Sequence, residues 1–497
     1  MMRGGAAGDP SRRSVGTPAG VRRSDPMAVE ALSPEGMPTH AGDLSIEGRG
    51  IEPIPADARY GSLGRIFTVW FTPQLVPAAF FVGTLAAADF LKVGFVTGVL
   101  AILVGNVVGA LLVGLLGTMG PATGMAQMPL ARAAYGKSIV VPGLLNWLSC
   151  IGWDGINSIF GAAALSLLTG MPFFVSLLII VVLQAALGVI GYEAIHTFEK
   201  YMAIVLGAMF VVLTIAIFGQ ASTGRADGFS GADQIGAFIL FTTICASFVL
   251  AWALYASDYS RYLPTNTSSF GIFWVTLLAL TLGAGWIEVL GLAVADKATG
   301  PSVGTINTIL GGGLLGGLAM IAIALGTVAV NALNDYTGSL SLLAAGIRVP
   351  RVASAFVVAV LGFLFTLYLN SGDFAGKFEG YLLFLSYWIA PWAAVVLVDW
   401  WLRRQRLNPM RLVSFSALPS GLLGLVSLVI GFLVSLPFQQ SSYGEELHTR
   451  YPFLPINVIS DNVLHYADLA YVVGFVVAAV IFWVGSRMMP ATSQEPM

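Results

Sequence analysis

The stretch "GWDGINSIFG", from Gly152 to Gly161, places an indole, a carboxylate and an amide inside a long run of apolar residues. A carboxylate is costly in hydrocarbon, and a buried amide there needs hydrogen-bond partners. Such side chains persist inside membranes where they line a cavity or pathway, or where they join packed helices. The stretch therefore predicts either a functional site or a polar helix contact within a membrane protein.

The composition of the whole chain supports the membrane class. The chain has 497 residues, of which 57% are hydrophobic and 10% are charged. Soluble domains carry about 25% charged residues, so a chain this apolar cannot hide its side chains in water-soluble domains. We predict an all-α polytopic membrane protein. The net charge of −2 gives no basic surface of the kind that binds nucleic acid.

Twelve hydrophobic segments are long enough to cross about 30 Å of hydrocarbon. They cover residues 66–91, 93–119, 141–168, 172–192, 201–220, 233–257, 269–295, 305–334, 351–371, 379–402, 412–437 and 468–488. The segment 305–334 is uneven because it contains Gly311, Gly312 and Gly313. Residues 121–136 are too short and mixed to span, and we expect an interfacial or buried cytoplasmic helix there.

The two ends of the chain differ from the region between them. Residues 1–60 are rich in Gly, Pro, Ser and Arg, lack an apolar run, and are expected to form a disordered cytoplasmic tail. Residues 61–488 form the predicted transmembrane domain, and 489–497 a short cytoplasmic tail. Cys150 and Cys245 fall inside predicted spans and are expected to be core residues without a disulfide. No zinc-ligand spacing or cofactor motif is present, so no metal or cofactor is predicted.

The loop charges predict how the chain is oriented in the cell membrane, where we expect it to reside. With both termini inside, the inner loops carry more Lys and Arg than the outer loops, as the positive-inside rule requires. The inner residues are Arg132, Lys137, Lys200, Arg261, Arg348, Arg351, Arg403, Arg404, Arg406, Arg411 and Arg487, and the outer ones are Lys92, Arg225, Lys297, Lys377 and Arg450.

Three predicted spans contain residues that interrupt a helix. The first holds Pro73 and Pro77, the sixth ends in "WALYASDYSRYLP", and the eighth contains Gly311 to Gly317 and then "NALND". Backbone groups freed from the helix ladder are tolerated in lipid only where they are buried or line a cavity. Interruptions at matching places in two halves indicate a transporter site, with simple helix kinking as the alternative.

Trp153 and Asn157 are the first candidate binding residues. They are four residues apart, so they share one helix face. An indole offers a flat apolar surface, and an amide offers two donors and an acceptor. Together they suit a planar, nitrogen-rich heterocycle, although an indole and an amide also serve in ordinary helix packing.

Asp154 and Glu288 are candidate coupling residues. Asp154 follows Trp153 and so points about 100° away, toward another helix or a water-filled path. Glu288 lies near the middle of the seventh predicted span. Carboxylates inside a membrane often belong to proton relays, and the alternative for each is a structural acid held by hydrogen bonds.

Further polar and aromatic residues lie in the sixth and eighth predicted spans. Phe248 and Trp252 are four apart, and Asn331 and Asn334 are three apart. An aromatic stripe is more often core than ligand site. Two amides in one buried helix require partners, which can be each other, the backbone or a ligand.

At these residues the chain resembles the purine–cytosine permeases of the nucleobase–cation symporter family. The similarity is an ordered series of segments across residues 49–404. The segments are "RGIEPIPADAR" (49–59), "GPATGMAQMPLARAAYG" (120–136), "CIGWDGINS" (150–158), "GYEAIHTFEKY" (191–201), "ASDYSRYLP" (256–264) and "YWIAPWAAVVLVDWWLRR" (387–404). Single segments are moderately specific, whereas their order and spacing together are specific.

The resemblance implies a fold and a substrate site. It implies twelve helices, with two inverted five-helix repeats as in the leucine transporter and two additional C-terminal helices. It implies a nucleobase such as cytosine or a purine as substrate. It assigns ring stacking to Trp153, a polar contact to Asn157 and base-binding amides to Asn331 and Asn334. Phe248 falls near the position of a second aromatic, and Trp252 is the neighbouring candidate.

One departure from the family's pattern concerns the coupling cation. Sodium-coupled relatives supply hydroxyl side chains from helix eight, whereas "GTVAVNALN" (326–334) offers only Thr327. Proton coupling is therefore favoured over sodium, with Asp154 and Glu288 as the residues to test. Allantoin, hydantoin, pyridoxine-type rings and nucleosides remain alternative substrates. An enzyme is disfavoured because the spans contain no His, no pair of metal ligands and no nucleotide-binding loop; a structural or receptor role is the remaining alternative.

Overall fold

The structure, a computed structural model, describes residues 51–190, 192–403 and 407–488, and every regular element in these ranges is helical. Most of the predicted N-terminal tail and all of the predicted C-terminal tail lie outside the described residues. The first helices are α1 Leu63–Phe71, α2 Pro77–Thr84, α3 Phe95–Gly117, α4 Met119–Thr123, α5 Gln127–Tyr135, α6 Val140–Thr169, α7 Phe173–Ile190, α8 Tyr192–Ile217, α9 Gly231–Leu250 and α10 Ala256–Ser260. The remainder are α11 Ser269–Ala293, α12 Val303–Ile309, α13 Gly313–Ala344, α14 Arg351–Leu369, α15 Phe374–Leu402, α16 Leu422–Ser435, α17 Ser442–Arg450, α18 Val458–Asn462 and α19 Ala470–Met488.

The helices agree with the predicted multi-pass membrane architecture. Within the described ranges, eight helical segments are long and apolar enough to cross a bilayer, and two bent helix pairs raise the number to ten. Phe173–Leu187 and Ala353–Leu369 are shorter apolar helices. Each of the twelve predicted segments overlaps at least one helix. The number of membrane crossings itself stays a prediction.

The helix interruptions predicted in the first and sixth spans are both present. The first predicted span is α1 and α2, which meet at an angle of 61° across residues 72–76. Pro77 is the first residue of α2, where its missing N–H leaves no bond unmade. The sixth predicted span is also divided, because α9 ends at Leu250 and residues 251–255 form a tighter turn before α10.

Three predicted boundaries need correction. The segment 305–334 is two helices, α12 and α13, because Gly311, Gly312 and Gly313 adopt positive φ values and turn the chain. Helix α13 then continues to Ala344, well past the predicted end. The segment 412–437 is helical only from Leu422, since short turns and Gly421 at φ 65° precede it. The predicted helix within 121–136 is α5, and all of its residues are buried.

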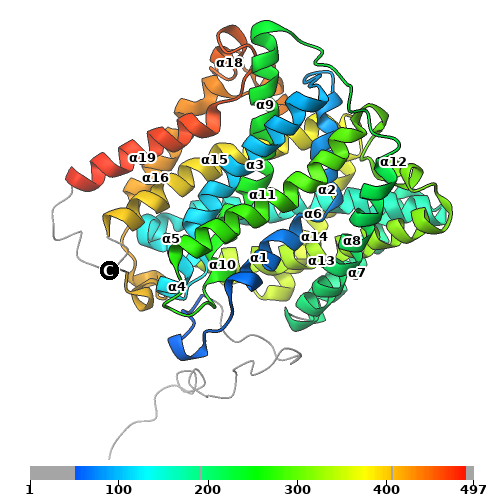
Figure 1. Cartoon of the computed structure of the whole chain (residues 1–497). Helices are drawn as coiled ribbons and strands as arrows, with labels where there is room; N and C mark the ends of the chain where they lie inside the picture. The colour runs from blue at the N-terminus through cyan, green and yellow to red at the C-terminus, as the bar shows by residue number, and fades with distance from the viewer. Residues whose placement is uncertain (1–50, 191, 404–406, 489–497) are drawn as a thin grey trace, which may run out of the picture.

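The helices pack into one bundle around α6 and α13, the pair with the most extensive contact. Helix α3 packs on α9 and α11, while α16 and α19 lie together against α15 at one side of the bundle and α7 and α8 lie at the other (Figure 1). Close approach at α2 and α11 requires small residues. A Cβ on Gly83 would stand 1.8 Å from the Glu288 carbonyl oxygen, and a Cβ on Gly291 would stand 1.9 Å from the Phe80 carbonyl oxygen.

Residues 51–60, at the end of the predicted tail, pack on the helical body. The Ile54 N–H donates to the Gly124 carbonyl at 2.9 Å, between α4 and α5. The Tyr60 N–H donates to the Tyr262 carbonyl at 2.6 Å, just after α10. The segment thus joins the end of α10 to the turn that precedes α5.

Candidate functional site

The α6 segment that carries Trp153 and Asn157 lies directly against α13. The two helices are antiparallel at this contact, because Gly161 abuts Thr327 while Asn146 donates to the Ser341 hydroxyl at 2.7 Å. Between these levels, Trp153 of α6 points toward α9 and α15, while Asp154 and Ser158 point toward α7 and α13. Asn157, one turn after Trp153, lies between these two directions.

The side of α6 that carries Trp153 forms an aromatic wall. The Trp153 ring lies 5.8 Å from Phe248 of α9 and 5.6 Å from Tyr381 of α15, in edge-to-face arrangements. The Tyr381 hydroxyl donates to the Ser149 carbonyl at 2.8 Å, which fixes the tyrosine against α6. Trp153 is half-buried, whereas Phe248 is buried. Three helices therefore hold one tryptophan whose ring keeps some exposed surface.

Trp252 lies in a different aromatic cluster. Its ring contacts Trp70 of α1 at 6.0 Å and Tyr255 at 6.2 Å. The turn at residues 251–255 accounts for this, because it breaks the helical spacing that had placed Trp252 beside Phe248. Phe248 is consequently the aromatic of this region that the structure brings to Trp153, and Trp252 bridges the broken helix to α1.

A buried network of amides centred on Asn331 lies between α6, α7 and α13. Asn157 Nδ2 donates to Asn331 Oδ1 at 3.1 Å. Asn331 Nδ2 lies within hydrogen-bond distance of the Asp154 carbonyl (3.0 Å), the Ser158 hydroxyl (2.9 Å) and Gln184 Oε1 (2.8 Å). Asn331 is fully buried, so its own polar atoms are used within the protein. It holds Asn157 in place.

Asn334 is placed differently from Asn331. It is half-buried, and its Nδ2 has no hydrogen-bond partner among the described residues. A buried donor without a partner is costly, and a bound ligand is one way to satisfy it. Of the two α13 amides singled out in the sequence, Asn334 is the one whose side-chain N–H groups are available to a ligand.

Asp154 is completely buried and points toward α7, as its offset from Trp153 predicted. Its Oδ1 accepts a bond from Gln184 Nε2 at 2.7 Å, while its Oδ2 has no partner among the described residues. Glu288 lies elsewhere, between α11 and α3, where its Oε2 accepts from Asn106 Nδ2 at 2.5 Å. The structure does not bring the two acids together.

Two buried polar residues escaped the sequence analysis: Gln184, which belongs to the amide network, and Asp335, which lies near Asp154. Gln184 is fully buried in α7, and Asp335 is nearly so in α13. Asp335 lies in the segment "NALND", one residue after Asn334, so its presence in a hydrophobic span was a usable signal. Gln184 gave none, because an isolated glutamine in an apolar run does not identify its partner.

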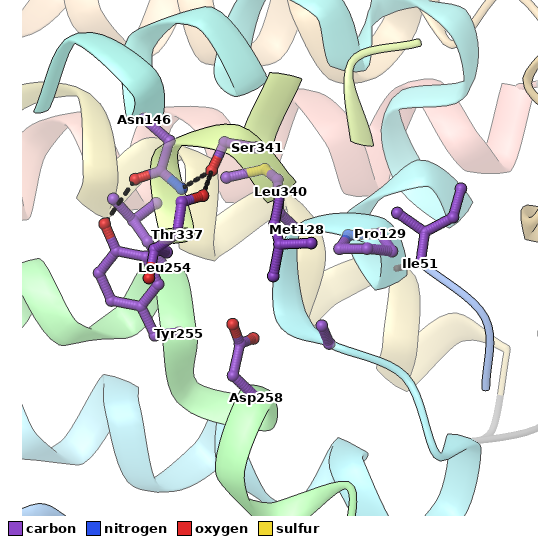
Figure 2. A pocket seen from close by; sticks show the side chains of 11 residues that line it. Ile51, Met128, Pro129, Asn146, Leu254, Tyr255, Asp258, Thr337, Leu340 and Ser341 are labelled. Atoms are coloured by element: carbon purple, nitrogen blue, oxygen red, sulfur yellow. Dashed lines mark hydrogen bonds between the residues drawn. The ribbon is translucent and has the colours of Figure 1, made fainter. Parts of the chain in front are cut away.

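Two small cavities flank the network, and each has room for about one water molecule. The first, shown in Figure 2, is lined by Asn146, Tyr255, Asp258 and Ser341, with Ile51 closing one side. The Tyr255 hydroxyl donates to Asn146 Oδ1 at 2.9 Å, which joins the broken helix to α6. The second cavity lies at the break between α1 and α2, where Val76 and Pro77 meet Asn157 and Thr327.

The arrangement suits recognition of a small flat molecule. It supplies an aromatic surface at Trp153 and an amide at Asn157, which lines a small cavity together with Val76 and Pro77 at the α1–α2 break. Within the described ranges, no three His, Cys, Asp or Glu side chains come together as a metal site would require.

Comparison with known proteins identifies close analogues of this fold and sequence. Two structures of Mhp1, a nucleobase-cation-symport-1 family transporter, superimpose well. The inward-facing conformation has a TM-score of 0.69, is 18% identical, and covers 91% of this chain and 95% of its own. The closed conformation, with bromovinylhydantoin bound, has a TM-score of 0.68, is 18% identical, and covers 90% of this chain and 96% of its own. These likenesses establish the polytopic transporter fold.

Sequence relatives extend over most of the chain. The putative purine-cytosine permease YxlA of Bacillus subtilis is 25% identical over 456 residues, which are 89% of this chain and 96% of the relative. The purine-cytosine permease fcyB of Emericella nidulans is 28% identical over 390 residues, 72% of this chain and 74% of the relative. Residues 53–474 match the model of the permeases for cytosine/purines, uracil, thiamine and allantoin. The chain therefore belongs to this purine–cytosine permease family of nucleobase–cation symporters, which are membrane transporters and not enzymes.

Proposed function

We propose that the chain imports a nucleobase, such as cytosine or a purine, across the cell membrane together with protons. The observation that carries this proposal is the Trp153 ring, held edge-on by Phe248 and Tyr381, one helical turn from the Asn157 amide. A nucleobase is planar and has hydrogen-bonding groups around its edge. The site offers one surface for its face and amides for its edge.

Each residue then has a distinct role. The base stacks on Trp153, and its edge bonds to Asn157 and Asn334. Asn331 orients Asn157 and does not reach the base, because its polar atoms are occupied by the protein. Phe248 supports the Trp153 ring, and Trp252 joins the α9–α10 break to α1 through Trp70.

The finer architecture that fits this role is twelve membrane helices with two inverted five-helix repeats, two further C-terminal helices and both termini in the cytoplasm. Related contacts support the repeat. Helix α2 packs on α11 as α9 packs on α3, and α6 packs on α14 as α13 packs on α7. Both breaks, α1–α2 and α9–α10, fall in equivalent members of these pairs. Rocking of one set of helices against the other around the site would give alternating access.

Protons are the proposed coupling ions. Two buried acids, Asp154 and Glu288, are the coupling residues that the sequence suggests, and Asp154 adjoins the amide network. Sodium requires about six oxygen ligands. Thr327 lines the cavity at the α1–α2 break, but its hydroxyl is directed at the Asn157 carbonyl at 3.4 Å, and Ala329 and Val330 add no side-chain oxygen.

The experiment is uptake of radiolabelled cytosine by cells that lack their own nucleobase carriers. We expect saturable uptake that a protonophore abolishes and that sodium replacement leaves unchanged. Unlabelled purines should compete. Sodium-dependent uptake insensitive to the protonophore would contradict proton coupling.

A second ring compound is the alternative substrate. The family description includes uracil, thiamine and allantoin, and Mhp1 was solved with a hydantoin bound. An aromatic wall with two amides accepts any of these small rings. A competition panel of allantoin, hydantoin, pyridoxine, a nucleoside and the nucleobases distinguishes them, because the true substrate should displace the label at the lowest concentration.

A further inference from the structure

We propose that Asp154 and Asp335 form a buried acid pair that holds the coupling proton beside the substrate site. This inference rests on the proposed proton-coupled transport and assigns the coupling to a pair that includes Asp335. Glu288 is outside this pair.

The packing of α6 on α13 places the two acids at one level. Asn331 contacts the Asp154 carbonyl, and two turns later along α13 Gly338 abuts the Cys150 side chain. Asp335 is four residues after Asn331, so it shares the face of α13 that meets α6 and lies between these two contacts. The carboxylates of Asp154 and Asp335 are close enough to interact electrostatically, and the Cys150 thiol also interacts electrostatically with both acids.

The carboxylates are buried without adequate partners. Asp154 is 0% exposed and Asp335 is 2% exposed. Neither oxygen of Asp335 and only one oxygen of Asp154 has a hydrogen-bond partner among the described residues. Two carboxylates in one buried site cannot both be ionised at reasonable cost, so the pair requires a proton or a cation. A proton on one acid would neutralise it and leave a single negative charge.

The surroundings favour a proton over a cation. Among the titratable groups of the described residues, the Cys150 thiol lies near both acids and the Tyr255 hydroxyl lies 3.5 Å from the Cys150 sulfur, and both groups are neutral in their ordinary forms. Helix α7 contributes the neutral Gln184, and α14 contributes Gly362, whose added Cβ would strike Asp154 Oδ2 at 1.9 Å. That close packing leaves little room for a hydrated ion against this oxygen.

The same contacts connect the pair to the substrate site. Gln184 bonds to Asp154 through Nε2 and to Asn331 through Oε1, and Asn331 holds Asn157. Loss of the proton would change the charge next to Gln184 and thereby the positions of Asn331 and of Asn157, which hydrogen-bonds to the base in the proposed function. This linkage gives the reciprocal effect that coupling requires, since the base in turn stabilises the protonated pair.

The test compares coupled uptake with exchange in proteoliposomes. Asp335→Asn should lower the accumulation of labelled substrate driven by an imposed proton gradient by about tenfold, within the range of typical coupling energies. Exchange of labelled for unlabelled substrate, which needs no gradient, should continue. Glu379→Gln is the matched control: Glu379 is a buried acid of α15 that accepts a bond from the Ser442 N–H, and the amide keeps that acceptor. It should accumulate substrate like the unmodified protein.

Several outcomes would separate this inference from the proposed function. Gradient-driven accumulation by Asp335→Asn equal to that of the unmodified protein would overturn the acid pair. The acid pair would also be overturned if Glu288→Gln lost gradient-driven accumulation while Asp335→Asn kept it. If Asp335→Asn fails to give a monodisperse protein, Asp154→Asn tests the same pair by the same comparison. Failure of the unmodified protein to transport any ring would refute the proposed function itself.

Discussion

Two of the helix contacts that bury a carboxylate in the described part of the chain, α3–α11 and α6–α13, do so in different ways. At α3–α11, Glu288 has a single amide partner, Asn106, in a region where Gly83 brings the α2 backbone onto the Glu288 carbonyl. At α6–α13, Asp154 and Asp335 lie in a network of amides, flanked by an aromatic wall and two small cavities. Each contact leaves at least one carboxylate oxygen without a hydrogen-bond partner among the described residues, but only the second brings two acids together beside an amide network.

The difference shows that a buried acid is a weak indicator of function when it is considered alone. From the sequence, Asp154 and Glu288 looked equivalent, since each is one carboxylate in an apolar helix. In the structure, their neighbours separate them: a second acid, a network of amides and an aromatic ring surface lie at α6–α13. We therefore expect changes at α6–α13 to impair transport, and changes at α3–α11 to act mainly on stability.

The largest expected effect is that of Trp153→Ala. Stacking of a base on an aromatic side chain contributes about 1–3 kcal/mol by alanine substitution, so uptake at low substrate concentration should fall about 5- to 150-fold. Radiolabelled uptake normalised to surface protein measures this. Trp401→Ala is the control, because Trp401 is 63% exposed at the end of α15 and should transport normally. Equal losses of uptake in Trp153→Ala and Trp401→Ala would mean that Trp153 has no special role in binding the substrate.

The next largest effect is on the stability of the amide network. Asn331→Leu leaves Gln184, Ser158 and Asn157 short of a partner, at about 1–3 kcal/mol for each unsatisfied buried group. We expect a clear drop in Tm together with loss of uptake, measured by thermal denaturation in detergent. Asn462→Leu, at an exposed position in α18, should leave Tm nearly unchanged. An unaltered Tm in Asn331→Leu would show that the network does not stabilise α6–α13.

A smaller effect is expected from Gly83→Ala at the other contact. The added Cβ would stand 1.8 Å from a backbone oxygen of α11, so the helices must separate, at a cost of about 1–3 kcal/mol for overpacking. Tm should fall, while the Km for substrate of the folded fraction should stay close to that of the unmodified protein. Gly304→Ala has nothing within 4 Å and provides the control. A changed Km with unchanged Tm would mean that α2–α11 belongs to the transport site.

The smallest effect is expected from Glu288→Gln. The glutamine retains an acceptor for Asn106, so the net change should stay within about 1 kcal/mol. Gradient-driven accumulation should stay close to that of the unmodified protein, because Glu288 lies outside the proposed acid pair. Transport that no longer depends on the proton gradient in this variant would contradict this expectation. It would mean that the coupling acid is Glu288 of α11 and not the pair at α6–α13.

The sequence predicted the helical class and most of the elements because hydrophobic length and proline position act locally. Pro73 and Pro77 identified the α1–α2 break, and Trp153 and Asn157 mark the helix of the proposed site. The sequence could not predict which partner each side chain meets. Trp252 was placed beside Phe248 by helical spacing, but the turn at residues 251–255 removes that spacing. Gln184 and Asp335 acquire their importance only from helices that are distant in sequence.

The central claim is that the α6–α13 face binds a flat ring against Trp153. The most direct measurement is equilibrium binding of radiolabelled cytosine, with purines, allantoin and a hydantoin as competitors, to the purified protein and to Trp153→Ala and Trp401→Ala. We predict saturable binding of at least one ring by the unmodified protein and by Trp401→Ala, with affinity reduced about tenfold or more in Trp153→Ala. Unchanged affinity in Trp153→Ala would place the substrate elsewhere and contradict the account.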